Sequence, residues 1–88
     1  MEVEFLQSFS KDIDAVRSTD LKKKIAKIIV QVEMAERFST LHNIKKMKGH
    51  PHAYRIRVGD YRIGLFIEDT LVQFARFAHR KEIYRLFP

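Results

Sequence analysis

Three arginines alternate along one short stretch of the chain, and their spacing suits the recognition of phosphate groups. Arg55 and Arg57 lie two residues apart, and Arg62 follows shortly after the dipeptide Gly59-Asp60. Side chains two residues apart in an extended strand point to the same face. A guanidinium group keeps its proton and binds phosphate oxygens in pairs. The three arginines therefore indicate one face of a hairpin that binds a polyanion.

Other residues near these arginines suit the binding of a nucleotide. Phe66 shares the alternation of Arg62 and offers a ring on which a base can stack, while Gly64 between them leaves a hollow. In the next apolar segment Arg76 favours placing Val72, Phe74 and Arg76 on this same open face. The alternative is that these are ordinary surface arginines on an exposed sheet.

The positive charge of the chain belongs to its second half. Residues 1–44 carry seven basic and seven acidic side chains, whereas residues 45–88 carry ten basic and four acidic ones, which gives a formal net charge of +6. An anionic partner should therefore meet the second half, although positive charge also promotes solubility. Four lysines of the first half are predicted to form a solvated helix face, with contact to an RNA backbone as the alternative. They are Lys22, Lys23, Lys24 and Lys27.

Length and composition restrict the kind of site that this chain can build. A chain of 88 residues has room for one domain, 1–88, so a site must lie on the surface of its single core. The absence of cysteine excludes disulfides and thiolate chemistry, and it favours a reducing compartment, for which the cytoplasm is the expectation. Neither secretion nor a membrane span is expected, because the first residues are acidic and nowhere do about 18 apolar residues follow one another. His42, His50 and His52 lack zinc-site spacing, so neither metal nor cofactor is expected.

The elements that must position the arginines are predicted to form an α+β fold. A short strand is expected around residues 2–5, followed by a helix that Ser8 caps and a second helix from Ser18 or Thr19 to about Arg37. Residues 38–53 show no clear period and are predicted to form a connection. Three antiparallel strands, 55–58, 61–67 and 71–78, and a short helix, 81–86, complete the chain.

The predicted architecture is two N-terminal helices packed on one face of a small antiparallel sheet, with the strand at residues 2–5 as a fourth member. A short C-terminal helix follows the sheet. The apolar residues of the hairpin should face the helices, which leaves its arginines on the opposite face. These apolar residues are Ile56, Val58, Ile63, Leu65 and Ile67.

Two runs of residues resemble the signature of the RelE/ParE superfamily of type II toxin–antitoxin systems. They are Tyr54-Arg55-Ile56-Arg57-Val58-Gly59-Asp60-Tyr61-Arg62-Ile63 and Ala78-His79-Arg80-Lys81-Glu82-Ile83-Tyr84. The resemblance implies a microbial-ribonuclease-like fold. RelE-like members cut mRNA without a metal, commonly in the ribosomal A site, whereas ParE-like members act on DNA gyrase.

The resemblance also implies roles for particular residues. The basic and C-terminal residues that RelE-like catalysis uses correspond here to Arg55, Arg57, Arg62, Arg80 and Tyr84, and His79 lies where some members place a histidine. ParE-like proteins often lack the C-terminal groups, so their presence favours cleavage of mRNA over inhibition of gyrase. A degenerate member that acts only by binding is a further alternative.

Metal-free RNA cleavage has the 2′-hydroxyl attack the adjacent phosphate, which requires charge stabilisation and proton transfer. We assign the charge stabilisation to Arg62 and Arg80. His79 is the first candidate for proton transfer, because free histidine has a pKa of about 6.5; a hydrogen-bonded surface histidine is the alternative. Tyr84 is expected to stack on a base or orient the sugar, unless it packs. The expected RNA-binding residues are Lys46, Lys48, Arg55, Arg57, Phe66 and Arg76.

The chain departs from some relatives, because residues 38–59 contain no carboxylate that could serve as the general base. The identity of that base therefore stays open. The expected partners are mRNA, with the ribosome, and a cognate antitoxin. A segment of the antitoxin, helical in this prediction, would dock on apolar or basic surface and either cover the arginines or displace the terminal helix.

Overall fold

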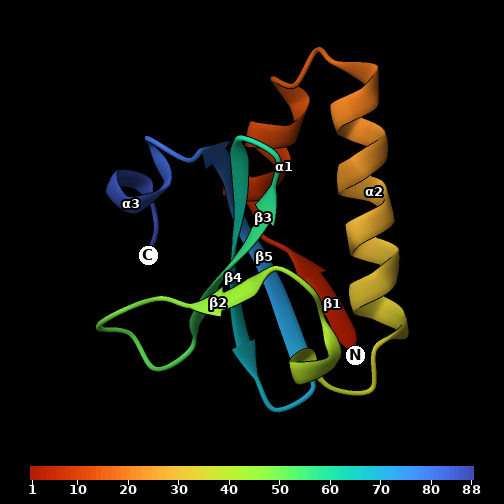
Figure 1. The fold of residues 1–88 in the computed structure, drawn as a ribbon, viewed down its shortest axis with the longest axis vertical. Coiled ribbons are helices and arrows are strands. Elements are labelled where there is room, and N and C mark those ends of the chain that lie inside the picture. Colours follow the sequence, from red (N-terminus) through yellow and green to blue (C-terminus); the bar gives the residue numbers. More distant parts are fainter.

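The computed structural model describes residues 1–88 and shows one mixed sheet with helices on both sides (Figure 1). The strands stand in the order β1-β5-β4-β3-β2. In chain order the elements are β1 (Glu2–Phe5), α1 (Gln7–Asp14), α2 (Thr19–Met34), a 3₁₀ turn (Phe38–Thr40), β2 (Ile44–Lys46), β3 (Ala53–Val58), β4 (Tyr61–Glu68), β5 (Leu71–His79) and α3 (Ile83–Leu86). The predicted α+β fold and its three-stranded antiparallel meander are confirmed.

The central hairpin follows from its turn and its alternation. Gly59 adopts a φ of 58°, a left-handed conformation that glycine reaches without a steric cost, and Asp69 takes a φ of 54° in the next turn. Arg57 then lies directly opposite Arg62, and Ile56 lies opposite Ile63. The apolar row of the hairpin is buried beneath α1 and α2 as predicted.

The two edges of the sheet differ from the prediction. β1 joins as expected but runs parallel to β5, with Glu2 opposite Leu71 and Phe5 opposite Phe74. At the other edge β2 pairs with β3 inside the segment predicted to be irregular, with Ile44 opposite Ile56. A strand of three residues is too short to produce a detectable period, and alternation along β1 carries no information about the direction of its partner.

Helix ends are partly as predicted. Ser18 caps α2, because its Oγ accepts a hydrogen bond from the Leu21 amide at 3.2 Å. α2 ends at Met34, earlier than expected, since Ala35 is already extended. Ser8 is not the cap of α1 but lies inside that helix, where its Oγ donates a hydrogen bond to the Ala75 carbonyl at 2.6 Å.

A β-bulge in β5 overturns the predicted orientation of that strand. Leu65 pairs with Phe74 while its neighbour Gly64 pairs with Arg76, so Ala75 is the extra residue. Val72 and Phe74 are consequently fully buried under the helices instead of lying on the open face with Arg76. The prediction was wrong because strict alternation assumes an unbroken ladder, and a bulge shifts the alternation by one residue.

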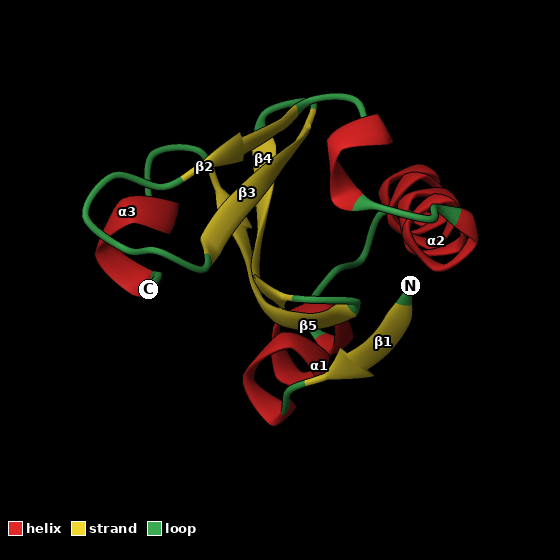
Figure 2. Cartoon of the chain, turned by 90° about the horizontal axis from the view of Figure 1, so that it is seen from below, coloured by secondary structure: helices red, strands yellow, loops and turns green.

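The face of the sheet away from α1 and α2 carries a second, smaller core. Figure 2 shows α3 on the opposite side of β3 and β4 from α2. The buried residues of this core are Met47, Ala53, Ala75, Ile83 and Phe87. The face that we expected to be open is therefore covered at one end, and only the part near the β3–β4 turn presents the arginines.

Candidate nucleic-acid interface

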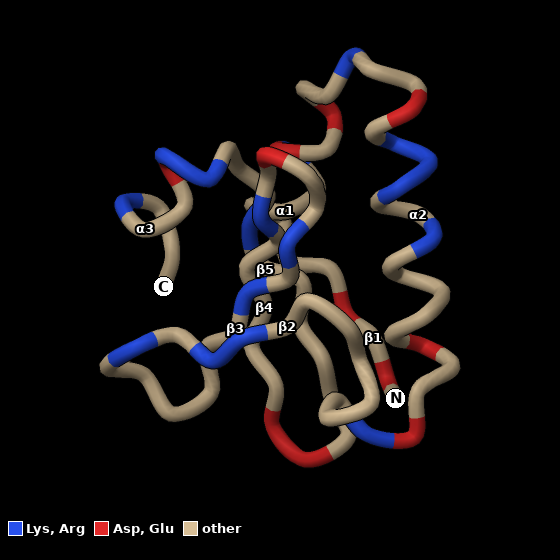
Figure 3. Tube along the Cα trace, in the orientation of Figure 1, with Lys and Arg blue, Asp and Glu red and all other residues tan.

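A group of basic side chains and one tyrosine gathers on the sheet face that carries α3. We call this group the arginine surface; it consists of Arg55, Arg57, Arg62, Arg80 and Tyr84. Figure 3 shows basic residues along β2 and β3 and in the segment before α3, while acidic residues lie mainly on β1, on the helices and at the turns between strands. The charge asymmetry of the sequence thus becomes a basic patch on one side of the molecule.

Arg57 and Arg62 form the centre of the arginine surface. Because they are direct cross-strand partners, their Cβ atoms are about 5 Å apart, at which like charges repel. The Nη1 of Arg62 donates hydrogen bonds to the carbonyls of Gly59 at 2.9 Å and Tyr61 at 2.8 Å. The side chain is therefore held in place by backbone oxygens rather than by a carboxylate.

The charge environment of Arg62 shows how crowded this surface is. Desolvation of its guanidinium, followed by repulsion from Arg55 and Arg57, lowers the pKa of Arg62 from its usual value. Arg80 lowers this pKa further, while Tyr84 acts in the opposite direction. Guanidinium nevertheless keeps its proton in proteins. The arrangement concentrates positive charge without a neutralising partner, which favours an incoming anion.

Arg80 and Tyr84 reach the arginine surface from the segment after β5. The Arg80 amide donates a hydrogen bond to the Asp60 carbonyl at 2.8 Å, which ties this segment to the β3–β4 turn. Tyr84 is 63% exposed, and the Cζ of Arg55 lies 5.7 Å from the centre of its ring. The predicted packing alternative for Tyr84 is thus not what the structure shows.

His79 lies at the edge of this group on the other side of the strand. Ala78 pairs with Arg62 and shares its face of the sheet. The next residue, His79, pairs with Tyr61 and therefore points to the opposite face, which α1 and α2 cover. Its ring stands edge-on to Tyr61 at 5.4 Å, and its Nδ1 accepts a hydrogen bond from the Lys81 amide at 3.2 Å. The structure therefore does not bring His79 onto the arginine surface.

Pairing of β2 distinguishes between its two lysines. Lys45 lies opposite Arg55 and so shares the face of the arginine surface. Lys46 lies opposite Tyr54, on the face that α1 and α2 cover. Lys48 is exposed in the loop that follows. Sequence reasoning missed Lys45, because the segment was predicted to be irregular; the signal was the apolar Ile44 directly before it.

Phe66 and Arg76 are engaged in packing rather than presented to a ligand. The ring of Phe66 lies between Phe87, at 4.9 Å, and His50, at 5.6 Å. Arg76 forms an ion pair with Asp12 of α1, at 2.8 Å from Nε to Oδ2. The hollow expected at Gly64 is filled by the Phe87 ring, which corrects the prediction of an open seat for a base.

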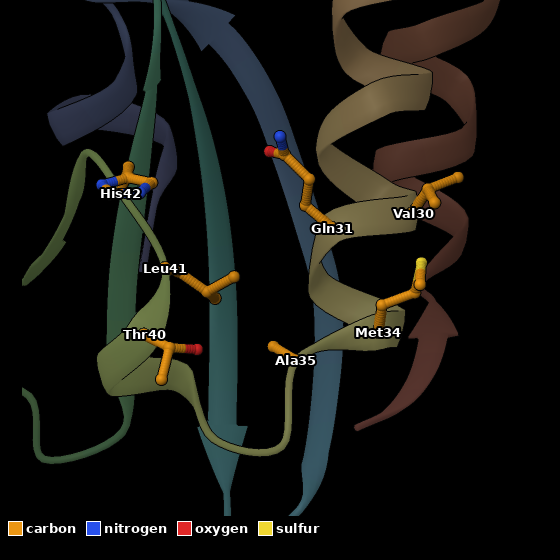
Figure 4. A pocket seen from close by; sticks show the side chains of 7 residues that line it. All are labelled: Val30, Gln31, Met34, Ala35, Thr40, Leu41 and His42. Carbon is orange, nitrogen blue, oxygen red and sulfur yellow. The ribbon is translucent and has the colours of Figure 1, made fainter.

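A second exposed surface lies beside the C-terminal turns of α2. Figure 4 shows a groove of about 310 Å³ between α2 and the segment before β2. Its lining residues are Val30, Gln31, Met34, Ala35, Thr40, Leu41 and His42.

The predicted lysine face of α2 is exposed. None of the helices combines the length and the apolarity needed to cross a membrane.

Comparison with known proteins places this geometry among similar chains. The family model described as the ParE toxin of type II toxin-antitoxin systems, parDE, matches residues 3–84. Toxin RelE3 of Methanocaldococcus jannaschii is 40% identical over an alignment of 89 positions that covers all of both chains. A chain of the RelB-RelE antitoxin-toxin complex from Methanococcus jannaschii is 38% identical and superimposes with a TM-score of 0.81, covering 97% of this chain and 99% of that one. The RelE-RelB complex from Pyrococcus horikoshii shares the fold at 16% identity, with a TM-score of 0.73 and coverage of 93% and 97%.

Proposed function

This chain belongs to the RelE/ParE superfamily, the toxins of type II toxin–antitoxin systems, and we propose that it is an endoribonuclease that cleaves mRNA on the ribosome. The observation that carries the proposal is the arginine surface, where four guanidinium groups and a tyrosine meet without a carboxylate partner. Such a surface can bind an RNA phosphate and stabilise added negative charge on it. The inhibition of DNA gyrase, or binding without catalysis, are the competing functions.

The chemistry that we propose is an internal transfer of the phosphate. The 2′-oxygen forms a bond to the adjacent phosphorus and loses its proton to a base, and the bond to the 5′-oxygen breaks as that oxygen gains a proton. Arg62, held by two backbone carbonyls, and Arg80, tied to the turn, stabilise the phosphorane. Preorganised charges of this kind need no rearrangement as the transition state forms.

Two residues are candidates for the proton transfer. Tyr84 stands on the arginine surface, and its phenolic hydroxyl both donates and accepts hydrogen bonds. It can also orient the attacking sugar or stack on a base. His79 lies at the edge of the surface beside Tyr61, so a role in proton transfer requires the substrate to extend past the end of β5. The placement of the two rings supports Tyr84 as the group in direct contact with RNA.

The remaining basic residues supply affinity for the RNA backbone. Arg55, Arg57 and Lys45 share one sheet face with Arg62 and can follow successive phosphates. Lys46 and Lys48 extend the positive field along β2 and its loop. Binding of this kind weakens as salt rises, because it releases counterions from the RNA.

The second partner that we propose is a cognate antitoxin. Both archaeal structures described above are complexes of a RelE chain with RelB. An antitoxin segment that covers the arginine surface would block RNA by occupying the same charges. The apolar groove beside α2 offers a separate anchoring point for such a segment, because Val30 and Met34 are exposed there.

Primer extension on cellular mRNA after induction of the protein tests the proposed activity. We expect new 5′ ends within translated regions. Intact mRNA together with a DNA damage response would instead support gyrase inhibition. The purified protein with programmed ribosomes should leave upstream fragments with 2′,3′-cyclic phosphate ends, whereas 5′-phosphate on the downstream fragments would contradict the 2′-hydroxyl mechanism.

The Arg62→Ala variant tests the role of the arginine surface. Loss of a preorganised charge should lower the single-turnover rate by about 10² to 10³, with a smaller effect on RNA affinity. Arg37→Ala serves as the control, because Arg37 is an exposed arginine before the 3₁₀ turn and lies outside the arginine surface. Equal rates for the two variants would contradict the proposed mechanism.

A further inference from the structure

Beyond the charged groups, the geometry points to Phe87 as a positioning residue: we infer that its ring, seated on Gly64, fixes α3 so that Tyr84 stands against the arginines. This inference deepens the proposed function, since Tyr84 is a member of the arginine surface. It rests on three features of the fold, namely the seat of the ring, the shortness of α3 and the register of the strands.

The seat of the ring is a gap that a glycine creates in the middle of β4. A Cβ atom on Gly64 would lie 2.5 Å from Cδ2 and 2.6 Å from Cγ of Phe87, closer than such atoms approach. Phe87 is only 3% exposed, and its ring packs against that of Phe66 at 4.9 Å between ring centres. Ala53 and Ala75 of the neighbouring strands belong to the same cluster, and their small side chains leave room for the ring.

α3 cannot hold its own position, because it is only four residues long. A helix of this length gains little from its own hydrogen bonds, so its place is set by packing. Its ion pair, between Arg85 and Glu82, joins residues of the same turn and does not connect α3 to the sheet. Ile83 and Phe87 are four residues apart and both buried, and they anchor one face of the turn.

Tyr84 lies between these two anchors and points the other way. On its N-terminal side the segment is already tied to the β3–β4 turn through the Arg80 amide. On its C-terminal side Phe87 is the buried anchor. Release of the Phe87 ring would leave α3 attached at one end only, so that Tyr84 would no longer be held near Arg55.

Strand register links the seat directly to the arginine surface. Gly64, on which the ring sits, is the cross-strand partner of Arg55, whose guanidinium lies 5.7 Å from the Tyr84 ring. One cross-strand pair therefore contains both Gly64, on which the Phe87 ring sits, and Arg55, which contacts Tyr84. This also gives a reason for a glycine inside a central strand, where glycine otherwise weakens the strand.

The test compares Phe87→Ala and Gly64→Ala with the parent protein. Hydrogen exchange measured by mass spectrometry should show lost protection in residues 83–87 and unchanged protection in α2 for both variants. The rate of RNA cleavage should fall about 10- to 100-fold, as misplacement of a group by about 1 Å can cause, with a smaller loss of RNA affinity, because the arginines that bind phosphate stay in place. Combining Gly64→Ala with Phe87→Leu should restore part of the rate, because the smaller side chain relieves the clash.

A fluorescence measurement separates this inference from the proposed enzymatic activity. The chain contains no tryptophan, so a Tyr84→Trp variant gives a single reporter at this position. Adding Phe87→Ala to it should lower the anisotropy and shift the emission to longer wavelength in the absence of RNA. Unchanged exchange and anisotropy would overturn the inference, and so would undiminished cleavage by a protein whose α3 has lost protection. If the parent protein does not cleave RNA, the proposed function fails while the fluorescence still decides the role of Phe87.

Discussion

Removal of the Asp12 carboxylate is expected to be one of the most destabilising single changes outside the core. Its Oδ2 accepts hydrogen bonds from Nε of Arg76 at 2.8 Å and from the Phe77 amide at 2.9 Å, and its Oδ1 accepts from Nη2 of Arg76 at 3.2 Å. The side chain of Asp12 is 18% exposed and that of Arg76 is 28% exposed. One carboxylate thus joins α1 to β5 just after the β-bulge.

The expected magnitude follows from the groups that would lose their partner. In Asp12→Ala the Phe77 amide and the Arg76 guanidinium are both left without an acceptor in a partly buried place, which costs about 2–3 kcal/mol in total. In a domain of this size each kcal/mol lowers the Tm by about 4–8 °C, so the Tm should fall by roughly 10–20 °C. Arg76→Ala leaves the bond to Phe77 intact and should cost about 1 kcal/mol.

Thermal unfolding followed by circular dichroism measures both losses, and a double-mutant cycle isolates the ion pair from the bond to Phe77. RNA affinity, measured well below the Tm, should be close to that of the parent for Arg76→Ala. If the Tm of Asp12→Ala falls by less than about 2 °C, the stabilising role assigned to the Asp12 carboxylate is refuted. Weakened RNA binding by Arg76→Ala without loss of stability would return Arg76 to the RNA-binding set.

Three further predictions test the arginine surface and its edges. Arg57→Gln removes a like charge opposite Arg62 and should raise stability by about 0.2–1 kcal/mol in denaturant titrations while it weakens RNA binding; a less stable variant would contradict the crowding argument. Lys45→Gln should reduce the salt dependence of RNA binding by about one phosphate contact, whereas Lys46→Gln should change it less, and the reverse order would refute the register of β2. If His79 exchanges the proton, His79→Gln should lower the cleavage rate by about 10² and remove a limb of the pH–rate profile. If His79→Gln leaves the profile unchanged while Tyr84→Phe cleaves RNA slowly, the proton transfer is assigned to Tyr84.

The parts of the fold that were predicted correctly are those whose signal is local. The alternation on either side of Gly59-Asp60 combines a turn that permits positive φ with β-branched residues, so the hairpin and the common face of its arginines followed directly. The second helix was marked in the same way by Ser18 as its cap and by an apolar stripe along one side. Each of these signals lies within a few residues of the structure that it produces.

The parts that were missed depend on contacts between distant residues. The extra residue at Ala75 shows only when β5 is laid against β4, and it reverses the side to which Val72 and Phe74 point. Likewise, the absence of a side chain at Gly64 correctly indicated a hollow in the sheet face, but the ring that fills this hollow comes from Phe87. Alternation along one strand cannot reveal which distant side chain will pack on it. The prediction therefore overestimated how much of the sheet face on the arginine side is open to a ligand.

The parallel pairing of β1 with β5 bears on the order in which the molecule can assemble. Gln73 donates a hydrogen bond to Glu4, a residue 69 positions earlier in the chain. Contacts of such long range close large loops, which slows folding, so the pairing of β1 with β5 is expected to form late. The docking of α1 must also wait for β5, since Ser8 and Asp12 bond to that strand. A chain still being translated therefore lacks the strand that joins its two halves, and Arg80 and Tyr84 emerge later still. The complete arginine surface requires Arg80 and Tyr84, so chains that are still too short to include them would not carry it.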